Sequence, residues 1–201
     1  ILALVGVFMF VGGIIRLIIQ PSMSQLMEDV RQGTLDFTLT KPCDAQFLVS
    51  ISQIHIWRVI DIALGIAVLL TALIYRDIHI SWGDIGLFAI VLVTGGTIIY
   101  SFWLMLATLT FWFLRIENIL VIFQSMYEAG RWPIGIYPTW LRYVLTFLVP
   151  VAFAITVPAE ALAGRLTTET LITSIGLSIG MLAASRWFWK RGLQNYSGAS
   201  A

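Results

Sequence analysis

The chain has 201 residues, of which 59% are hydrophobic and only 11% are charged, against roughly 25% charged residues in an average soluble domain. A soluble protein of this size could not bury so much apolar surface, because its accessible surface grows steeply with its mass. The net charge of +1 argues against nucleic acid as a partner, since there is no basic face to release counterions from phosphates. The composition predicts an integral membrane protein, with lipid as its surroundings.

The cysteine content and the first residue of the sequence bear on how the chain is processed. A single cysteine, Cys43, rules out an intrachain disulfide framework, and we interpret it as a bystander thiol. The sequence begins at Ile1, inside an apolar run and without the basic leader of a signal peptide. We therefore expect a fragment that lacks its N-terminus and one earlier span.

A helix needs about 20 apolar residues to cross about 30 Å of hydrocarbon. Five segments meet or approach this length, and their apolar runs are continuous rather than alternating, which favours helices over barrel strands. Tryptophans mark several of their ends, as is typical of membrane interfaces. The expected spans are Ile1–Ile19, Ile54–Tyr75, Ile85–Phe113, Ile119 to about Ile136, and Leu171–Trp189.

The distribution of Lys and Arg predicts the orientation of these spans. Assigning alternate loops to alternate sides places eight of the twelve Lys and Arg residues on or near one face. Cytoplasmic loops carry the excess of these residues, so that face is predicted to be cytoplasmic. It includes the C-terminal segment and the stretch between the first two spans, residues 20–53, which we call the polar segment. The intact protein should then have six spans and both ends inside.

The stretch from Arg131 to Arg165 combines membrane-grade apolarity with four prolines. Proline inside a helix removes a hydrogen bond and kinks it, and broken helices at membrane depth need a protein cover. We expect two half-helices, between about Tyr137 and Arg165, that enter the outer leaflet and return. One proline-kinked span is the alternative, and it would place the C-terminus outside. The residues of interest in this external region are Arg131, Pro133, Pro138, Trp140, Pro150, Pro158 and Glu160.

No G-x-x-x-x-G-K-[ST] P-loop and no His/Cys cluster occurs, so we expect neither an ATP site nor a metal site in this chain. The run "GLSIG" matches a nucleophile elbow, but it lies inside an apolar helix and lacks the strand-to-helix turn that such an elbow needs. Its small residues Gly176 and Gly180, with Ala184, instead predict close helix packing.

Ionisable residues inside spans are candidates for function by default. Asp61 lies one helical turn from Arg58 near the expected cytoplasmic end of its span. Glu128 and Arg131 have the same i,i+3 spacing near the expected outer mouth. Pairing within each helix is the favoured interpretation, and a place along a substrate path is the alternative.

Three local patterns resemble one family of membrane proteins. The first is "VRQGTLDFTLTKP", after the first span seen here. The second is "RWPIGIYPTWLRYVLTFLVPVAFAITVPAEALAGR", with its Pro–x–Trp–Leu–Arg region ahead of the last span, and the third is the terminal "FWKRGLQNYSGASA". Together they cover about a third of the chain and are similar to the ABC-2 type exporter permeases, in the branch of ABC-2 family transporter proteins.

The resemblance implies an all-α integral membrane domain, residues 1–201, with six helices in the intact protein and a half-helix pair before the last. It implies a multi-pass protein of the bacterial cytoplasmic membrane. Two permease halves, identical or sister chains, would form a pathway above two separate ABC ATPase subunits. ATP and Mg²⁺ would then belong to those subunits, with no cofactor and no catalysis in this chain.

The polar segment would then be the coupling loop to the ATPase. Gly33 would permit a tight turn, Pro42 would fix the exit, and the charged residues would face the partner; without the resemblance, a solvated loop is an equally good interpretation. The expected coupling residues are Glu28, Asp29, Arg31, Gly33, Asp36, Lys41 and Pro42. The alternative function is a non-transport membrane subunit, such as a scaffold or a component of a pigment complex, which would not copurify with an ATPase.

Overall fold

The computed structural model describes residues 2–75, 82–113, 118–128, 131–132, 134–143, 151–162 and 164–196. These residues form helices and turns, with no β-strand among them. Four of the described helices are long and apolar enough to cross a membrane, and two shorter apolar helices accompany them. The prediction of an all-α membrane domain is confirmed.

The first span is one continuous helix over Leu2–Gln32. α1 (Leu2–Ile14) passes into a π-helical turn, η1 (Ile15–Ile19), and then into α2 (Gln20–Gln32). At 1.5 Å per residue this helix is about 46 Å long, which exceeds the roughly 30 Å of a hydrocarbon core. The expected span therefore continues well beyond its apolar part, and α2 carries it toward the polar segment.

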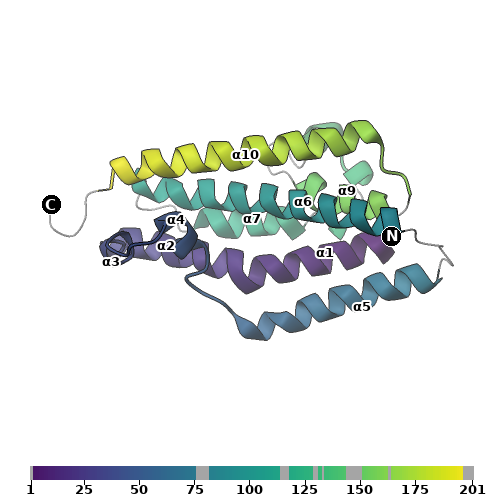
Figure 1. Cartoon of the computed structure of the whole chain (residues 1–201), viewed down its shortest axis with the longest axis horizontal. Coiled ribbons are helices and arrows are strands. Elements are labelled where there is room, and N and C mark those ends of the chain that lie inside the picture. Colours follow the sequence, from purple (N-terminus) through teal and green to yellow (C-terminus); the bar gives the residue numbers. More distant parts are fainter. Residues whose placement is uncertain are drawn as a thin grey trace.

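Three further helices are long enough to cross a membrane: α5 (Val59–Tyr75), α6 (Trp82–Thr108) and α10 (Thr168–Gln194). Figure 1 shows them lying along the long axis of the molecule beside α1. α5 packs mainly on α1, α10 packs on α6, and a 3-10 turn, η3 (Leu109–Phe111), follows α6. The close approach of α1 and α5 depends on glycine, because a Cβ on Gly65 would lie 2.5 Å from the backbone nitrogen of Phe10.

The fourth expected span, Ile119 to about Ile136, is wrong in its length. The helix there is α7 (Asn118–Glu128), and residues Ile134–Ile136 form a separate 3-10 turn, η5. Gly130 and Pro133 lie in this stretch of the sequence, and both residue types are unfavourable inside a helix. The apolar composition indicated a span, whereas the described helix covers only Asn118–Glu128.

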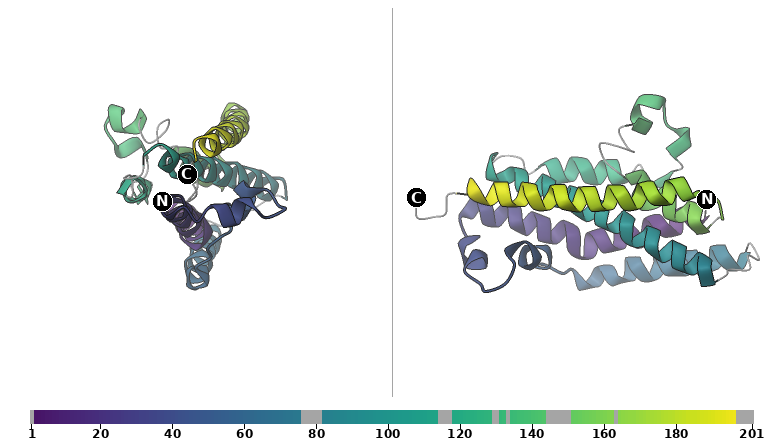
Figure 2. Two further views of the ribbon diagram at one scale, coloured as in Figure 1. Left: turned by 90° about the vertical axis from the view of Figure 1, so that its left-hand side faces the viewer. Right: turned by 45° about the horizontal axis from the view of Figure 1, so that its top comes forward.

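The short helices α8 (Thr139–Tyr143) and α9 (Val151–Leu162) follow. They are the two short helices expected between about Tyr137 and Arg165, although residues 144–150 and Pro133 lie outside the described residues. In Figure 2 the green segment that contains α8 stands away from the bundle. α9 instead packs against α6 and α1. Their depth in a membrane stays a prediction.

α7 and α9 cover different parts of the α1–α6 pair. Phe123 of α7 packs edge-on against Phe102 of α6, with ring centroids 5.0 Å apart. α9 crosses α6 farther toward its N-terminus, where a Cβ on Gly95 would lie 2.8 Å from Cα of Ala154. α7 is thus shorter than the span expected there, and α9 lies in the region where two half-helices were expected.

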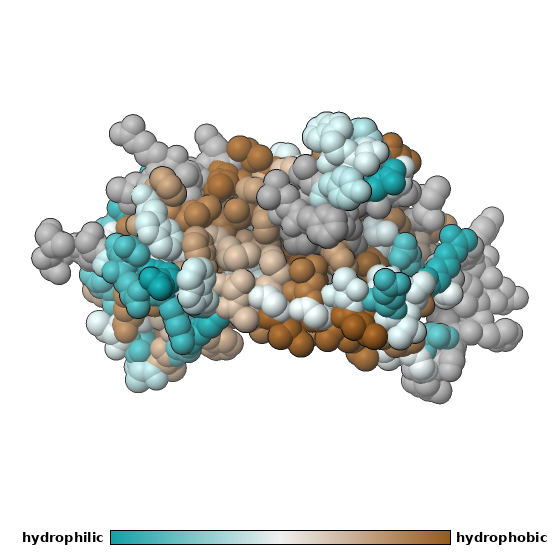
Figure 3. Space-filling model, turned by 90° about the horizontal axis from the view of Figure 1, so that it is seen from above, coloured by the Kyte–Doolittle hydropathy of each residue, from teal (hydrophilic) through white to brown (hydrophobic). Residues whose placement is uncertain are grey.

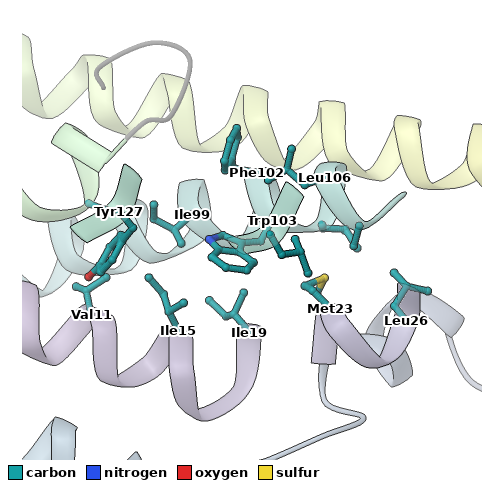
Figure 4. Close-up of a cluster of buried hydrophobic side chains, with 14 of the residues drawn as sticks. Val11, Ile15, Ile19, Met23, Leu26, Ile99, Phe102, Trp103, Leu106 and Tyr127 are labelled. Carbon is teal, nitrogen blue, oxygen red and sulfur yellow. The ribbon is translucent and has the colours of Figure 1, made fainter. Parts of the chain in front are cut away.

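The core of the bundle lies between the first span and α6. The buried residues of the first span recur every three or four positions, so they form one face of the helix. Figure 4 shows this face, from Val11 through Ile15, Ile19 and Met23 to Leu26, against Ile99 and Trp103 of α6. Because lipid is as apolar as these side chains, close packing rather than escape from water stabilises this contact in a membrane.

The visible face in Figure 3 has apolar side chains over its middle and hydrophilic ones near both ends. Large exposed apolar residues on α5, such as Ile60, Ile66, Leu70 and Ile74, contribute to such surface. An exposed apolar surface of this extent suits lipid contact, and a soluble monomer rarely carries one.

Candidate functional site

The polar segment folds into a compact helical unit at one end of the bundle. After α2 come α3 (Asp36–Leu39) and α4 (Ala45–Ser50), and a 3-10 turn, η2 (Ile56–Arg58), leads into α5. Leu35 and Val49 are buried in the core, so the unit is packed rather than solvated on all sides. Figure 1 shows α2, α3 and α4 together at the end of the bundle where α10 finishes.

Side chains tie α4 to two of the long helices. Arg186 of α10 forms an ion pair with Asp44 and donates hydrogen bonds to Asp44 Oδ1 at 2.9 Å and Gln46 Oε1 at 2.8 Å. Gln46 Nε2 donates to the Tyr100 hydroxyl of α6 at 3.2 Å, and Ser50 Oγ lies 2.7 Å from the same hydroxyl. These five side chains fix the position of α4 against α6 and α10.

Asp44 has a strongly perturbed acidity for a surface residue. Hydrogen bonds from Arg186, with help from the backbone N–H of Phe47, hold the pKa of its carboxyl at about 2. The Phe47 bond, at 3.2 Å, also makes Asp44 the N-cap of α4. The ion pair is therefore complete at neutral pH.

The exit of the polar segment is tied to the first span. Ser22 Oγ donates to the Gln53 carbonyl at 3.0 Å, and the His55 backbone N–H donates to the carbonyl of Leu17 at 2.8 Å. Leu17 lies within the π-helical turn. The polar segment thus contacts the first span, α6 and α10 through directed bonds.

Four of the expected coupling residues lie at or near the end of α2 itself. Glu28 and Arg31 form an ion pair at 2.6 Å, and Asp29 accepts a hydrogen bond from Thr34 Oγ1 at 3.1 Å. Gly33 ends α2 with φ 72° and ψ 15°, a left-handed conformation that suits the tight turn expected at this residue. These residues shape the turn into α3.

Other expected coupling residues, and some that were missed, are more available to a partner. Lys41 and Pro42 are exposed, whereas Asp36 is half-buried beside the hydroxyl of Tyr196. Burial, together with the charge of Asp36, raises the pKa of that tyrosine. The interpretation by charge missed Phe37, whose side chain is 75% exposed, and the exposed Phe47. Aromatic residues inside a polar stretch were the signal that could have revealed them.

Both expected ion pairs form, but they are not at opposite interfaces. Arg58 contacts Asp61 at 3.6 Å, and Arg131 contacts Glu128 at 3.7 Å. Arg16 joins the two pairs, with its Nε 3.1 Å from Asp61 and its Nη1 3.7 Å from Glu128. Because α7 is short, its last residue lies level with Arg16, and the expectation that Glu128 and Asp61 lie near opposite interfaces is wrong. We call these five residues the charge row.

The remaining residues of the expected external region do not gather into one site. Pro138 precedes α8, Trp140 on α8 is 67% exposed, and Pro158 lies inside α9 with Glu160 nearby on the same helix. Pro133 and Pro150 lie outside the described residues.

The small residues of α10 face away from the rest of the chain. A Cβ on Gly176 or Gly180 would meet nothing within 4 Å, and Ala184 is exposed. Close packing occurs elsewhere, for instance at Gly192, where a Cβ would lie 2.5 Å from Phe111. Their role in helix packing stays a prediction that concerns another chain. In the described ranges, no group of three His, Cys, Asp or Glu residues could hold a metal ion.

A family model described as ABC-2 family transporter protein matches residues 1–200. Neither a curated protein nor a solved structure matches the chain. The family match covers the polar segment, the charge row and all four membrane-length helices.

Proposed function

Because the chain belongs to the ABC-2 family of transporter proteins, we propose that it is one permease half of an ATP-driven exporter and that its polar segment docks a separate ATPase subunit. Membership of the family makes the chain a multi-pass membrane permease of ABC-type transport, and an ABC ATPase is the general partner of such permeases. The direction of transport and the docking surface are the proposed part.

One observation carries the docking proposal: the polar segment is bonded to three membrane-length helices at once. Arg186 connects α4 to α10, and Tyr100 connects α4 to α6. Ser22, on the part of the segment that continues the first span as α2, donates to the Gln53 carbonyl at the other end of the segment. A partner that pushes on this segment would therefore move all three helices. A loop with no mechanical role would need none of these bonds.

The exposed side chains of the polar segment also suit contact with a protein partner. Phe37 and Phe47 project from α3 and α4, and Lys41 and Pro42 lie between these helices. Buried aromatic anchors dominate the energy of protein interfaces, and truncating one often costs about 2 kcal/mol or more. A mixed aromatic and basic surface is a reasonable docking site for an ATPase subunit.

The test is copurification of the chain with its ATPase subunit from native membranes, followed by ATP hydrolysis assays on the reconstituted complex. Phe37→Ala should weaken ATPase binding roughly thirtyfold, which corresponds to about 2 kcal/mol. Lys41→Glu should also weaken it, and it is a cleaner charge reversal than one at Asp36, which contacts Tyr196.

Matched controls are Trp140→Ala and Arg165→Glu, which change an exposed aromatic and an exposed cation outside the polar segment. Both should bind the ATPase as the unmodified chain does. Equal ATPase binding and equal ATP hydrolysis in all four variants would show that the polar segment is an ordinary loop without a docking role. A chain that copurifies with no ATPase at all would favour a membrane scaffold.

We also infer that two permease halves, identical or sister chains, form the pathway in a bacterial cytoplasmic membrane, with the C-terminus on the ATPase side. The polar segment and the end of α10 lie at the same end of the bundle, in support of this arrangement. The small residues of α10 are open to another chain. Crosslinking in native membranes that gives only monomer, with no sister chain, would contradict the paired assembly. ATP and Mg²⁺ would bind only to the ATPase subunits.

A further inference from the structure

The charge row crosses three helices in an alternating order. Arg58 is the last residue of η2 and Asp61 lies at the start of α5. Arg16 lies in the π-helical turn, and Glu128 and Arg131 lie at and just after the end of α7. Charged side chains in membrane spans are expensive and mark functional sites more often than not. The whole row lies within the match to a transporter family.

The row has a surplus of positive charge at its two ends. Three guanidinium groups face two carboxylates, so the formal sum is +1. The central Arg16 is 23% exposed, whereas the outer Arg58 and Arg131 are 52% and 58% exposed. A row built only to neutralise charges would need no third arginine. The surplus positive charge therefore lies on the two more exposed arginines, Arg58 and Arg131.

The outer arginines have hydrogen-bonding capacity to spare. Within the described residues each contacts a single carboxylate, at 3.6 Å for Arg58 and 3.7 Å for Arg131. These separations exceed a normal N–H···O hydrogen bond, and a guanidinium has five N–H donors. An oxyanion could therefore take spare donors from the outer arginine at either end of the row.

The centre of the row is held in place before any ligand arrives. Arg16 lies in a π-helical turn, a distortion that is frequent at functional sites. A Cβ on Gly12 would lie 3.4 Å from Arg16 Nη2, so the guanidinium packs directly beside this glycine. Arg131 is also oriented, since its guanidinium lies over the ring of Phe8 at 5.5 Å. Such pre-organisation lowers the entropic cost of binding.

Each end of the row carries an exposed tryptophan next to its arginine. Trp57 precedes Arg58, and Trp132 follows Arg131; both indoles are exposed. Tryptophan favours the boundary between lipid and water. The sequence pairs Trp57–Arg58 and Arg131–Trp132 therefore combine an anion-binding donor with an apolar ring at that boundary.

We propose that each end of the charge row binds the anionic group of an amphipathic molecule, whose apolar part lies along the tryptophan next to that outer arginine and along the lipid. Its role as a site for exported cargo rests on the proposed function. The anion could come from a membrane lipid headgroup or from a separate amphiphile, because both offer the same oxyanion to the arginines.

The test uses the full chain with its ATPase in phosphatidylcholine nanodiscs, titrated calorimetrically with dodecyl phosphate after subtraction of empty nanodiscs. Replacing Arg58 and Arg131 together by Gln removes two charge-assisted donors and should weaken binding at least roughly tenfold. The control Arg165→Gln should bind dodecyl phosphate as the unmodified chain does. Inorganic phosphate, without an apolar part, and dodecyltrimethylammonium, with the opposite charge, should bind far more weakly.

Equal binding of dodecyl phosphate by the unmodified chain and the double variant overturns the proposal, as does tighter binding of the cationic amphiphile. Adding phosphatidylglycerol to the nanodisc tells the sources apart. If phosphatidylglycerol competes with dodecyl phosphate, the occupant is a lipid headgroup. If it does not compete, the occupant is a separate amphiphile. Either result supports the site. The calorimetric binding of dodecyl phosphate does not depend on coupling between the chain and its ATPase subunit. If the ATPase couples normally but the double variant binds as before, only the charge row fails; if no ATPase associates but binding depends on the arginines, only the exporter proposal fails.

Discussion

The ion pair between Asp44 and Arg186 should position α4 without contributing much to global stability. Asp44→Asn is the informative change, because asparagine keeps an N-cap acceptor for the Phe47 N–H and removes only the charge. The two side chains are 46% and 41% exposed, and exposed pairs contribute about 0–1 kcal/mol. The free energy of unfolding should therefore fall by no more than about 1 kcal/mol.

Local opening of α4 should respond more clearly than global unfolding. A loss of about 0.5–1 kcal/mol in holding α4 on α10 corresponds to roughly two- to fivefold faster hydrogen exchange at the amides of α4. The assay is hydrogen–deuterium exchange on the full chain in nanodiscs, with exchange in the middle of α6 as the internal reference. Unchanged protection of α4 in Asp44→Asn would refute the reasoning, and so would a loss of several kcal/mol in global stability.

The pH dependence of the same contact has a definite sign. The folded-state pKa of Asp44 is depressed to about 2, because Arg186 favours the charged carboxylate. A depressed carboxyl pKa contributes stability that is complete above the ordinary value near 3.8 and is lost as the pH falls through about 2. After correction for intrinsic exchange rates, the protection of α4 that this pair provides should be the same at pH 6 and pH 8.

Two glycines give further predictions, each measured by thermal unfolding of the full chain in detergent. Gly33→Val should destabilise the end of α2 by at least about 1–2 kcal/mol because of the left-handed backbone, whereas Gly33→Asn should cost less, since asparagine tolerates that conformation; equal losses would contradict the backbone argument. Gly65→Ala should cost about 1–3 kcal/mol, because its Cβ would lie 2.5 Å from the backbone of Phe10. Gly86→Ala, whose Cβ meets nothing within 4 Å, is the control and should not destabilise the chain.

Features that depend on neighbours in the sequence could be predicted. The pairing of Asp61 with Arg58, and of Glu128 with Arg131, follows from their spacing of three residues in the sequence, although Arg131 lies beyond the end of α7. The tight turn at Gly33 could be expected, because glycine is the residue type that most often ends a helix in a turn. The run of apolar residues in each long helix likewise identified four spans. Local rules were sufficient for these elements.

Features that depend on packing could not be predicted. Arg186 and Asp44 lie 142 positions apart in the sequence, and no local pattern connects them. Arg16 joins the two carboxylates only because the end of α7 lies level with the π-helical turn. The span expected up to about Ile136 failed for a related reason, since average apolarity does not reveal where a helix ends. Long-range contacts and the extent of α7 required the three-dimensional arrangement.

The charge row allows a last prediction, since its contacts differ in geometry. Arg16 donates to Asp61 at 3.1 Å in a partly buried position, whereas Arg58 approaches the same carboxylate only to 3.6 Å and is more exposed. In a double-mutant cycle, Arg16→Gln and Asp61→Asn should be non-additive by about 1–2 kcal/mol, the range for hydrogen-bonded, partly desolvated charges. Arg58→Gln and Asp61→Asn should couple by less than about 0.5 kcal/mol, as exposed pairs do.

The single change Asp61→Asn is not itself decisive, because removing a charge from a membrane span also relieves its desolvation cost. The coupling energies separate that relief from the interaction, since it is common to both cycles. Unfolding of the full chain in detergent, followed by tryptophan fluorescence, gives the required free energies. If the two cycles give equal coupling energies, then Arg16 is not the residue that holds Asp61, and the row would be two separate surface pairs rather than one connected element across α5, the first span and α7.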